Sequence, residues 1–163
     1  MNAARGGPTA VLSLGSNLGD RLGWLRLGVA VLAPYAVSPV YETEPVGALA
    51  QPDFLNVVVL ASLDAAGAWR LAQRAEREAG RDRAVPHGPR TLDVDVIVAD
   101  GTEPGLVLPH PRAHERAFVL APWADLEPSA ELPGYGPVQE LLGLLDGSGS
   151  PRVRLRADLE LAP

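Results

Sequence analysis

Residues 54–61 read Phe-Leu-Asn-Val-Val-Val-Leu-Ala, an apolar run that contains one polar side chain, Asn56. A short run rich in valine that follows a proline predicts a buried β-strand. Outward from it, strand patterns alternate with amphipathic helix patterns. On the N-terminal side lie a strand at residues 11–14, a helix at 18–32 that stops before Pro34, and a strand at 37–43. On the C-terminal side lie a helix at 65–79 and a strand at 92–98.

This order of elements predicts an α+β fold, a ferredoxin-like βαββαβ antiparallel sheet with both helices on one face and C-terminal additions. The other sheet face would then stay free for a ligand. The additions are a helical turn at 112–117, a helix at 138–145 and a last strand at 153–161, where Arg152, Arg154 and Arg156 would face solvent. The length of 163 residues suits one domain, residues 1–163.

Composition excludes several classes of protein. All 14 basic residues are arginine, so a P-loop or a lysine Schiff base cannot be built, and the absence of cysteine excludes thiolate metal sites. A net charge of −6 and a pI near 5.0 argue against a nucleic-acid partner. No apolar run approaches the roughly 18 residues of a membrane span. We therefore expect a cytoplasmic protein that acts on small molecules. We also expect it to be a monomer, although no sequence feature determines the oligomeric state.

Asp93 and Asp95 are candidates for a metal site. On a strand they would project from the same face, about 6–7 Å apart, while Leu92, Val94 and Val96 face the core. Neighbouring carboxylates repel each other unless cations lie against them, and hard oxygen ligands suit Mg²⁺ bound to a polyphosphate. Taken alone, an Asp-x-Asp pair is equally consistent with solvated side chains on an exposed strand.

Basic residues gather around this acidic pair. Arg81, Arg83 and Arg90 flank the loop that leads into it. Each guanidinium group can bind two phosphate oxygens at once. In a second cluster, His110 can donate to a phosphate oxygen and Arg116 can extend the cationic wall. Such a convergence favours phosphate binding over a set of unrelated surface charges.

Asn56 shares a strand face with Phe54. An amide at this position can pair with the donors and acceptors of a heterocycle while an aromatic ring stacks on its face. The alternative is an asparagine that is hydrogen-bonded to a neighbouring loop.

Taken together, several stretches of the chain resemble the 6-hydroxymethyl-7,8-dihydropterin pyrophosphokinase family of folate biosynthesis, over residues 10–128. The stretches are Leu14-Gly15-Ser16-Asn17-Leu18-Gly19, Tyr41-Glu42-Thr43-Glu44-Pro45, Gln51-Pro52-Asp53-Phe54-Leu55-Asn56, Gly88-Pro89-Arg90-Thr91-Leu92-Asp93-Val94-Asp95, Pro109-His110-Pro111 and Arg116-Ala117-Phe118-Val119-Leu120-Ala121-Pro122.

The resemblance implies a ferredoxin-like enzyme that transfers the β,γ-diphosphate of ATP to the hydroxymethyl oxygen of the pterin and releases AMP. It implies that Asp93 and Asp95 hold two Mg²⁺ ions and that Arg81 and Arg90 join them as catalytic residues. The implied ATP-binding residues are Gln73, Glu76, Arg81, Arg83, Arg90, His110 and Arg116. The implied pterin-binding residues are Thr43, Glu44, Val46, Phe54, Asn56, Asp95 and Phe118.

The chain departs from the family in the loop at residues 81–88. Pro86-His87 stands where relatives often carry Arg-Trp, and Ala84 replaces a position that is often basic. We predict that Arg83 and His87 supply the remaining contacts of this loop with substrate.

Three other functions are alternatives to pyrophosphoryl transfer. A magnesium-dependent phosphohydrolase would use the same aspartates without an aromatic clamp. A non-catalytic ferredoxin-like ligand-binding domain would not need the aspartates for chemistry. An RNA-binding domain is the least favoured, because the strand at 92–98 offers carboxylates where stacked aromatic rings would be needed.

Overall fold

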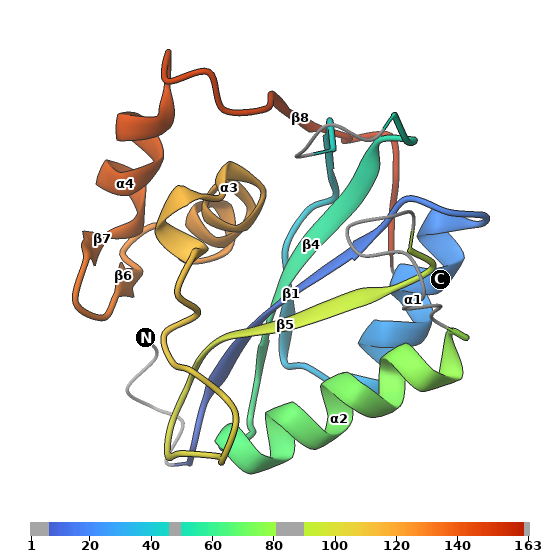
Figure 1. The fold of residues 1–163 in the computed structure, drawn as a ribbon, viewed down its shortest axis with the longest axis vertical. Helices are drawn as coiled ribbons and strands as arrows, with labels where there is room; N and C mark the ends of the chain where they lie inside the picture. Colours follow the sequence, from blue (N-terminus) through green and yellow to red (C-terminus); the bar gives the residue numbers. More distant parts are fainter. Residues whose placement is uncertain (1–6, 46–49, 81–89, 162–163) are drawn as a thin grey trace.

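The computed structural model describes residues 7–45, 50–80 and 90–161. Figure 1 shows the elements, which are β1 (Ala10–Ser16), α1 (Arg21–Leu32), β2 (Ala36–Val37), β3 (Tyr41–Thr43), β4 (Phe54–Ala61), α2 (Ala65–Glu78), β5 (Asp93–Ala99), a 3₁₀ turn η1 (Ala113–Glu115), α3 (Ala117–Leu126), β6 (Glu131–Leu132), β7 (Gly136–Pro137), α4 (Val138–Leu145) and β8 (Val153–Leu155).

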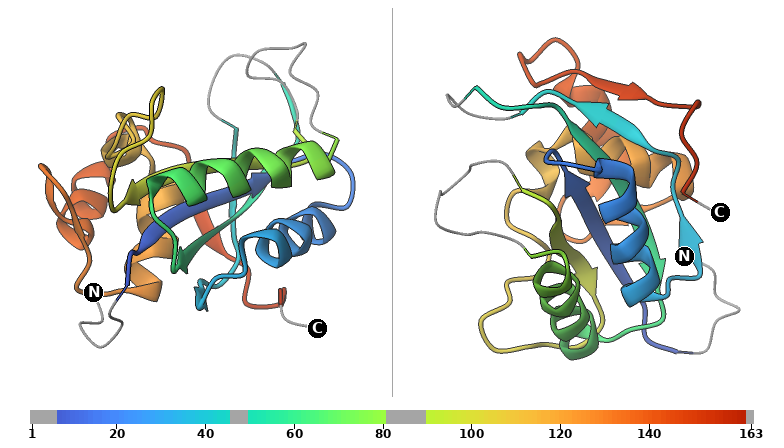
Figure 2. Two further views of the ribbon diagram at one scale, coloured as in Figure 1. Left: turned by 90° about the horizontal axis from the view of Figure 1, so that it is seen from below. Right: turned by 90° about the vertical axis from the view of Figure 1, so that its right-hand side faces the viewer.

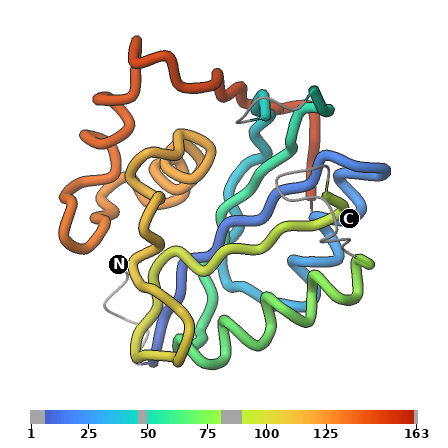
Figure 3. The backbone as a smooth tube through the Cα atoms, viewed as in Figure 1, coloured from blue at the N-terminus to red at the C-terminus, as the bar shows by residue number. Residues whose placement is uncertain are grey.

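The main sheet is antiparallel, with the strand order β5-β1-β4-β3-β8, and β2 also pairs with β4. The order β5-β1-β4-β3 is that of a ferredoxin-like βαββαβ unit, so the predicted fold class is confirmed. Helices α1 and α2 lie on one side of the sheet, and α3 and α4 lie on the other (Figure 2). After α4 the chain crosses to the far edge of the sheet and forms β8, a path that Figure 3 traces.

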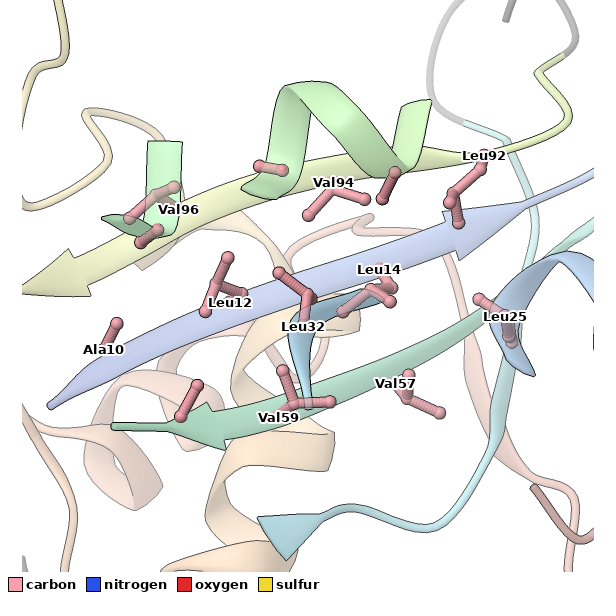
Figure 4. Close-up of a cluster of buried hydrophobic side chains, with 14 of the residues drawn as sticks. Ala10, Leu12, Leu14, Leu25, Leu32, Val57, Val59, Leu92, Val94 and Val96 are labelled. Atoms are coloured by element: carbon pink, nitrogen blue, oxygen red, sulfur yellow. The ribbon is translucent and has the colours of Figure 1, made fainter. Parts of the chain in front are cut away.

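The larger hydrophobic core lies between the sheet and the first helix pair. Alternate strand residues point into it, and Figure 4 shows side chains of β1, β4 and β5 gathered with Leu25 and Leu32 of α1. Helix α2 presents a row of buried alanines, Ala68, Ala72 and Ala75, whose small side chains allow the helix to lie close to the sheet. In α1, Gly28 serves the same purpose, because a Cβ there would lie 2.6 Å from the side chain of Leu14.

Each of these helices begins at an aspartate. The side chains of Asp20 and Asp64 accept a hydrogen bond from the backbone N–H three residues further on, at 3.1 and 2.8 Å. An N-cap of this kind contributes about 1 kcal/mol. The cap at Asp20 explains why α1 starts three residues later than the apolar pattern predicts.

The expectation that the second sheet face stays free is right only at one end. Helix α3 packs on that face, where Leu120 and Trp123 meet Val58 and Ile97 in a second cluster of buried side chains. The sequence predicts only a turn at 112–117 here, because Pro122 lacks a helical N–H donor and normally breaks a helix. Tertiary burial overrides that signal, since Pro122 is itself buried.

Two strand predictions are also wrong in extent. The strand at 37–43 is divided into β2 and β3, because the Ser38 hydroxyl accepts the Val58 N–H at 2.9 Å and interrupts the ladder. The last strand ends at Leu155, and the chain then turns at residues 157–158. Helix α4 has the predicted bounds. Within the described ranges, no helix is long and apolar enough to cross a membrane. That residues 1–163 form one domain stays a prediction.

Candidate active site

A cavity of about 430 Å³ lies at the uncovered end of the second sheet face. Strand residues form its floor, and the segment from His110 into α3 forms one side. The residues that line it are Ser13, Gly15, Thr43, Glu44, Gln51, Phe54, Asn56, Arg90, Asp93, Asp95, His110, Arg112, Glu115, Arg116, Ala117, Phe118, Ser150, Pro151 and Val153.

The two aspartates of β5 face this cavity. Val94, between them, is buried on the opposite side, so Asp93 and Asp95 project from one strand face as predicted. On the neighbouring strand β1 they lie opposite Gly15 and Ser13. These small residues leave the space above the carboxylates open.

Each aspartate has an arginine partner. Arg90 donates to Asp93 at 3.1 Å, and Arg116 donates to Asp95 at 3.4 Å. The four side chains are between 21% and 29% exposed, so the pairs are partly shielded from water. The guanidinium groups offset the repulsion between the carboxylates, and their remaining N–H groups are suited to phosphate oxygens.

His110 adds a neutral donor to this charged end. Burial lowers the pKa of His110, the positive charge of Arg116 lowers it further, and Asp93 opposes both effects. Its Nδ1 accepts the backbone N–H of Arg112 at 3.2 Å, so the neutral ring carries its proton on Nε2. Nε2–H can then donate to an anion in the cavity.

The other end of the cavity is aromatic and amide-lined. Phe54 and Asn56 lie on the same face of β4, and the Asn56 amide, 3% exposed, donates to the Thr43 hydroxyl at 2.8 Å. Phe118 enters from α3, with the Arg116 guanidinium 5.5 Å from the centre of its ring. A Cβ at Gly15 would lie 3.0 Å from Asn56, so a glycine keeps this floor open. The arrangement suits a flat heterocycle with polar edges.

Asn17 ties the two ends together, a role that the sequence did not predict. Its buried side chain accepts the Arg90 N–H at 2.7 Å and donates to Gln51 and to the Pro52 carbonyl, at 2.9 and 3.0 Å. Backbone groups of Asn17 and Arg90 are also bonded, at 3.1 Å. The only signal was that Asn17 and Gln51 fall in two of the quoted family stretches.

The predicted ATP-binding residues of α2 lie apart from the cavity. Gln73 is not among the lining residues, and Glu76 is buried beneath the helix, where it accepts the Val94 N–H at 3.0 Å. Their contact with ATP stays a prediction. Arg81, Arg83, Val46, Ala84, Pro86 and His87 lie outside the described residues, as does the predicted loop contact.

Other lining residues had no clear signal in the sequence. Arg112 and Glu115 lie at the rim, 3.6 Å apart, in the charged stretch that follows His110. The predicted roles of Thr43, Glu44, Phe54, Asn56, Arg90, Asp93, Asp95, His110, Arg116 and Phe118 all fall on residues that the fold brings to one cavity.

The fold and the cavity define a ferredoxin-like domain whose cavity carries paired carboxylate and guanidinium groups. The family model described as 7,8-dihydro-6-hydroxymethylpterin-pyrophosphokinase (HPPK) matches residues 11–128. The chain belongs to this family.

Curated relatives agree with this assignment. The chain is 50% identical over 153 residues to the 2-amino-4-hydroxy-6-hydroxymethyldihydropteridine pyrophosphokinase of Mycobacterium leprae. This match covers 83% of this chain and 80% of the relative. It is 45% identical over 129 residues to the protein of the same name from Bacillus subtilis. This second match covers 72% of this chain and 77% of the relative.

A solved structure of Plasmodium falciparum HPPK-DHPS superimposes with a TM-score of 0.67 at 12% identity. The match covers 88% of this chain and 46% of the solved chain, so this chain spans less than half of that protein's length. At this identity, the likeness supports the fold alone.

Proposed function

We propose that the chain catalyses the reaction of its family, transfer of the β,γ-diphosphate of ATP to the hydroxymethyl oxygen of 6-hydroxymethyl-7,8-dihydropterin. The observation that carries this is the division of one cavity into two ends. Two carboxylates, two guanidinium groups and a neutral histidine meet at one end, and two phenylalanines and a buried amide meet at the other. One end suits a polyphosphate, and the other suits a flat heterocycle.

The acidic pair fits Mg²⁺. Within the described ranges, no three His, Asp or Glu side chains cluster closely enough to hold a metal by themselves. Mg²⁺ characteristically takes one or two carboxylates and completes its shell with phosphate oxygens and water. Asp93 and Asp95 would hold the ions, two according to the family resemblance. When bound, Mg²⁺ would neutralise part of the negative charge of the phosphates.

In the reaction, a bond forms between the hydroxymethyl oxygen and the β-phosphorus. The bond between that phosphorus and the oxygen bridging to the α-phosphate breaks, and AMP leaves with this oxygen. Arg90 and Arg116 hold phosphate oxygens and stabilise negative charge as it shifts toward AMP. His110 donates through Nε2. The hydroxyl proton passes to solvent or to one of the nearby carboxylates.

At the heterocycle end, Phe54 and Phe118 sandwich the ring, while Asn56 and Thr43 read its polar edge. These four side chains orient the pterin, because they hold its hydroxymethyl oxygen in line with the β-phosphorus. Glu44 lines the same end. We also propose that the chain works as a monomer in the cytoplasm, without nucleic-acid or membrane partners, which is consistent with its net charge of −6.

The decisive experiment is incubation with ATP, Mg²⁺ and 6-hydroxymethyl-7,8-dihydropterin, followed by chromatography of the products. We expect AMP and pterin diphosphate in equal amounts, and no AMP without pterin. ADP or free phosphate would instead favour the phosphohydrolase. No turnover, with ligands still bound, would favour the non-catalytic domain.

A further inference from the structure

The C-terminal segment of residues 146–161, here called the tail, lies beyond the family-matched residues 11–128. It leaves α4, crosses the molecule and pairs as β8 with β3 (Figures 1 and 3). Val153 lies opposite Thr43, and Leu155 lies opposite Tyr41. Because Thr43 lines the cavity, this pairing brings the tail to the cavity wall.

Three tail residues line the cavity, namely Ser150, Pro151 and Val153. Val153 lies opposite Thr43, which lies opposite Phe54 in turn, and both of these residues belong to the heterocycle end. Pro151 and Val153 are apolar, so this wall suits a ring better than a triphosphate. All three tail residues are only partly exposed.

A buried carboxylate fastens the tail. Glu42, on β3, is 7% exposed, and its position between Tyr41 and Thr43 directs its side chain to the opposite sheet face. Its Oε1 accepts hydrogen bonds from Arg154 at 2.7 Å and from Arg156 at 3.0 Å. Arg154 is exposed, as predicted, but the prediction of a merely solvated face missed that Arg154 and Arg156 both bind a buried carboxylate.

The same carboxylate links the tail to the start of β4. Arg21, in the first turn of α1, donates to Glu42 Oε2 at 2.6 Å and to the Asp53 carbonyl at 3.0 Å, directly before Phe54. Burial alone would raise the pKa of Glu42, but the hydrogen bonds from Arg21 and Arg156 hold it below its ordinary value. The carboxylate is therefore ionised at neutral pH, and the cluster joins β8, β3, α1 and the residue that precedes Phe54.

We propose that the tail is a working wall of the heterocycle end, and that Arg154 and Arg156 are positioning residues that act through Glu42 to set the affinity for the pterin. This inference rests on the proposed function. It predicts an effect on one substrate only, because the ATP end lies across the cavity and none of its proposed phosphate-binding residues comes from the tail.

The test is steady-state kinetics on the full chain with Arg154→Ala and Arg156→Ala combined. We expect the KM for the pterin to rise about tenfold, while kcat and the KM for ATP change less than about twofold. The conservative pair Arg154→Lys and Arg156→Lys should restore most of the affinity, since it keeps both positive charges. Arg152→Ala is the matched control, because Arg152 is an exposed tail residue that does not line the cavity, and it should leave all three constants unchanged.

Val153→Ala tests the wall itself without disturbing the ion cluster, and it should raise only the KM for the pterin. An unchanged pterin KM in both the double alanine variant and Val153→Ala would overturn the proposal, as would equal losses for the two substrates. Turnover of the unmodified chain tests the proposed function separately, because the proposal depends only on ratios between variant and unmodified chain.

Discussion

Replacing Asn17 with alanine is expected to destabilise the fold and to impair both ends of the cavity. The Asn17 side chain is 1% exposed and makes three hydrogen bonds of 2.7, 2.9 and 3.0 Å, to Arg90, Gln51 and Pro52. Each such bond contributes about 1 kcal/mol net, so the free energy of unfolding should fall by about 3 kcal/mol. The loss is large because buried partners without an alternative donor or acceptor retain their desolvation cost.

Urea denaturation measures this change, and the midpoint should fall while the slope stays constant. The kcat/KM should fall by about tenfold or more for both substrates, because Arg90 and the segment before Phe54 lose their common anchor. Asn17→Asp is a second test, since it keeps the acceptor for the Arg90 N–H but places a buried carboxylate oxygen against the Pro52 carbonyl, so it should be at least as unstable as Asn17→Ala. A loss below about 1 kcal/mol in Asn17→Ala, with unchanged kinetics, would refute the reasoning.

Three further predictions concern the cavity. Asp95→Asn should lower kcat by about 10² or more, because it removes a proposed metal ligand while preserving side-chain size, and AMP release measures the loss. Near-normal turnover would exclude a catalytic role for that carboxylate. Combined Phe54→Ala and Phe118→Ala should abolish pterin-dependent AMP formation while ATP binding, followed by calorimetry, is retained; equal activity would instead support the phosphohydrolase. Finally, the pKa of His110 is lowered in the fold, so the unfolded chain holds more protons on this ring. Protonation of His110 therefore does not lower the free energy of unfolding above the ordinary histidine pKa of about 6.5. As the pH falls below that value, the free energy of unfolding decreases, because the unfolded chain takes up the proton more readily. The urea midpoint of the unmodified chain should therefore fall between pH 7.5 and pH 5.5, and it should fall less in His110→Asn. An equal fall in both proteins would contradict a lowered pKa of His110.

Local patterns predicted the parts of the structure that depend on neighbouring residues. The alternation along 92–98 was enough to place Asp93 and Asp95 on one face, and the apolar spacing gave α4 its bounds. The order of helices and strands then predicted the ferredoxin-like unit, because few topologies fit that order.

What sequence reasoning missed depends on contacts between distant residues. Glu42 and Arg154 are separated by 112 positions, and Asn17 and Arg90 by 73, so no local pattern relates them. Helix α3 was missed for a different reason. Pro122 opposes a helix in isolation, and only packing against the second sheet face compensates for the lost hydrogen bond.

The bond between Glu76 and the Val94 N–H also has a consequence for behaviour in concentrated solution. β5 is an outer strand of the sheet, and exposed backbone groups on such a strand can recruit a strand from another molecule. Glu76 occupies one of these groups from within the same chain. At the opposite edge, β8 is three residues long, follows Pro151 closely and carries Arg154. The outer strands β5 and β8 are therefore poor templates for a strand from another molecule. We expect the chain to resist aggregation through edge-to-edge strand pairing.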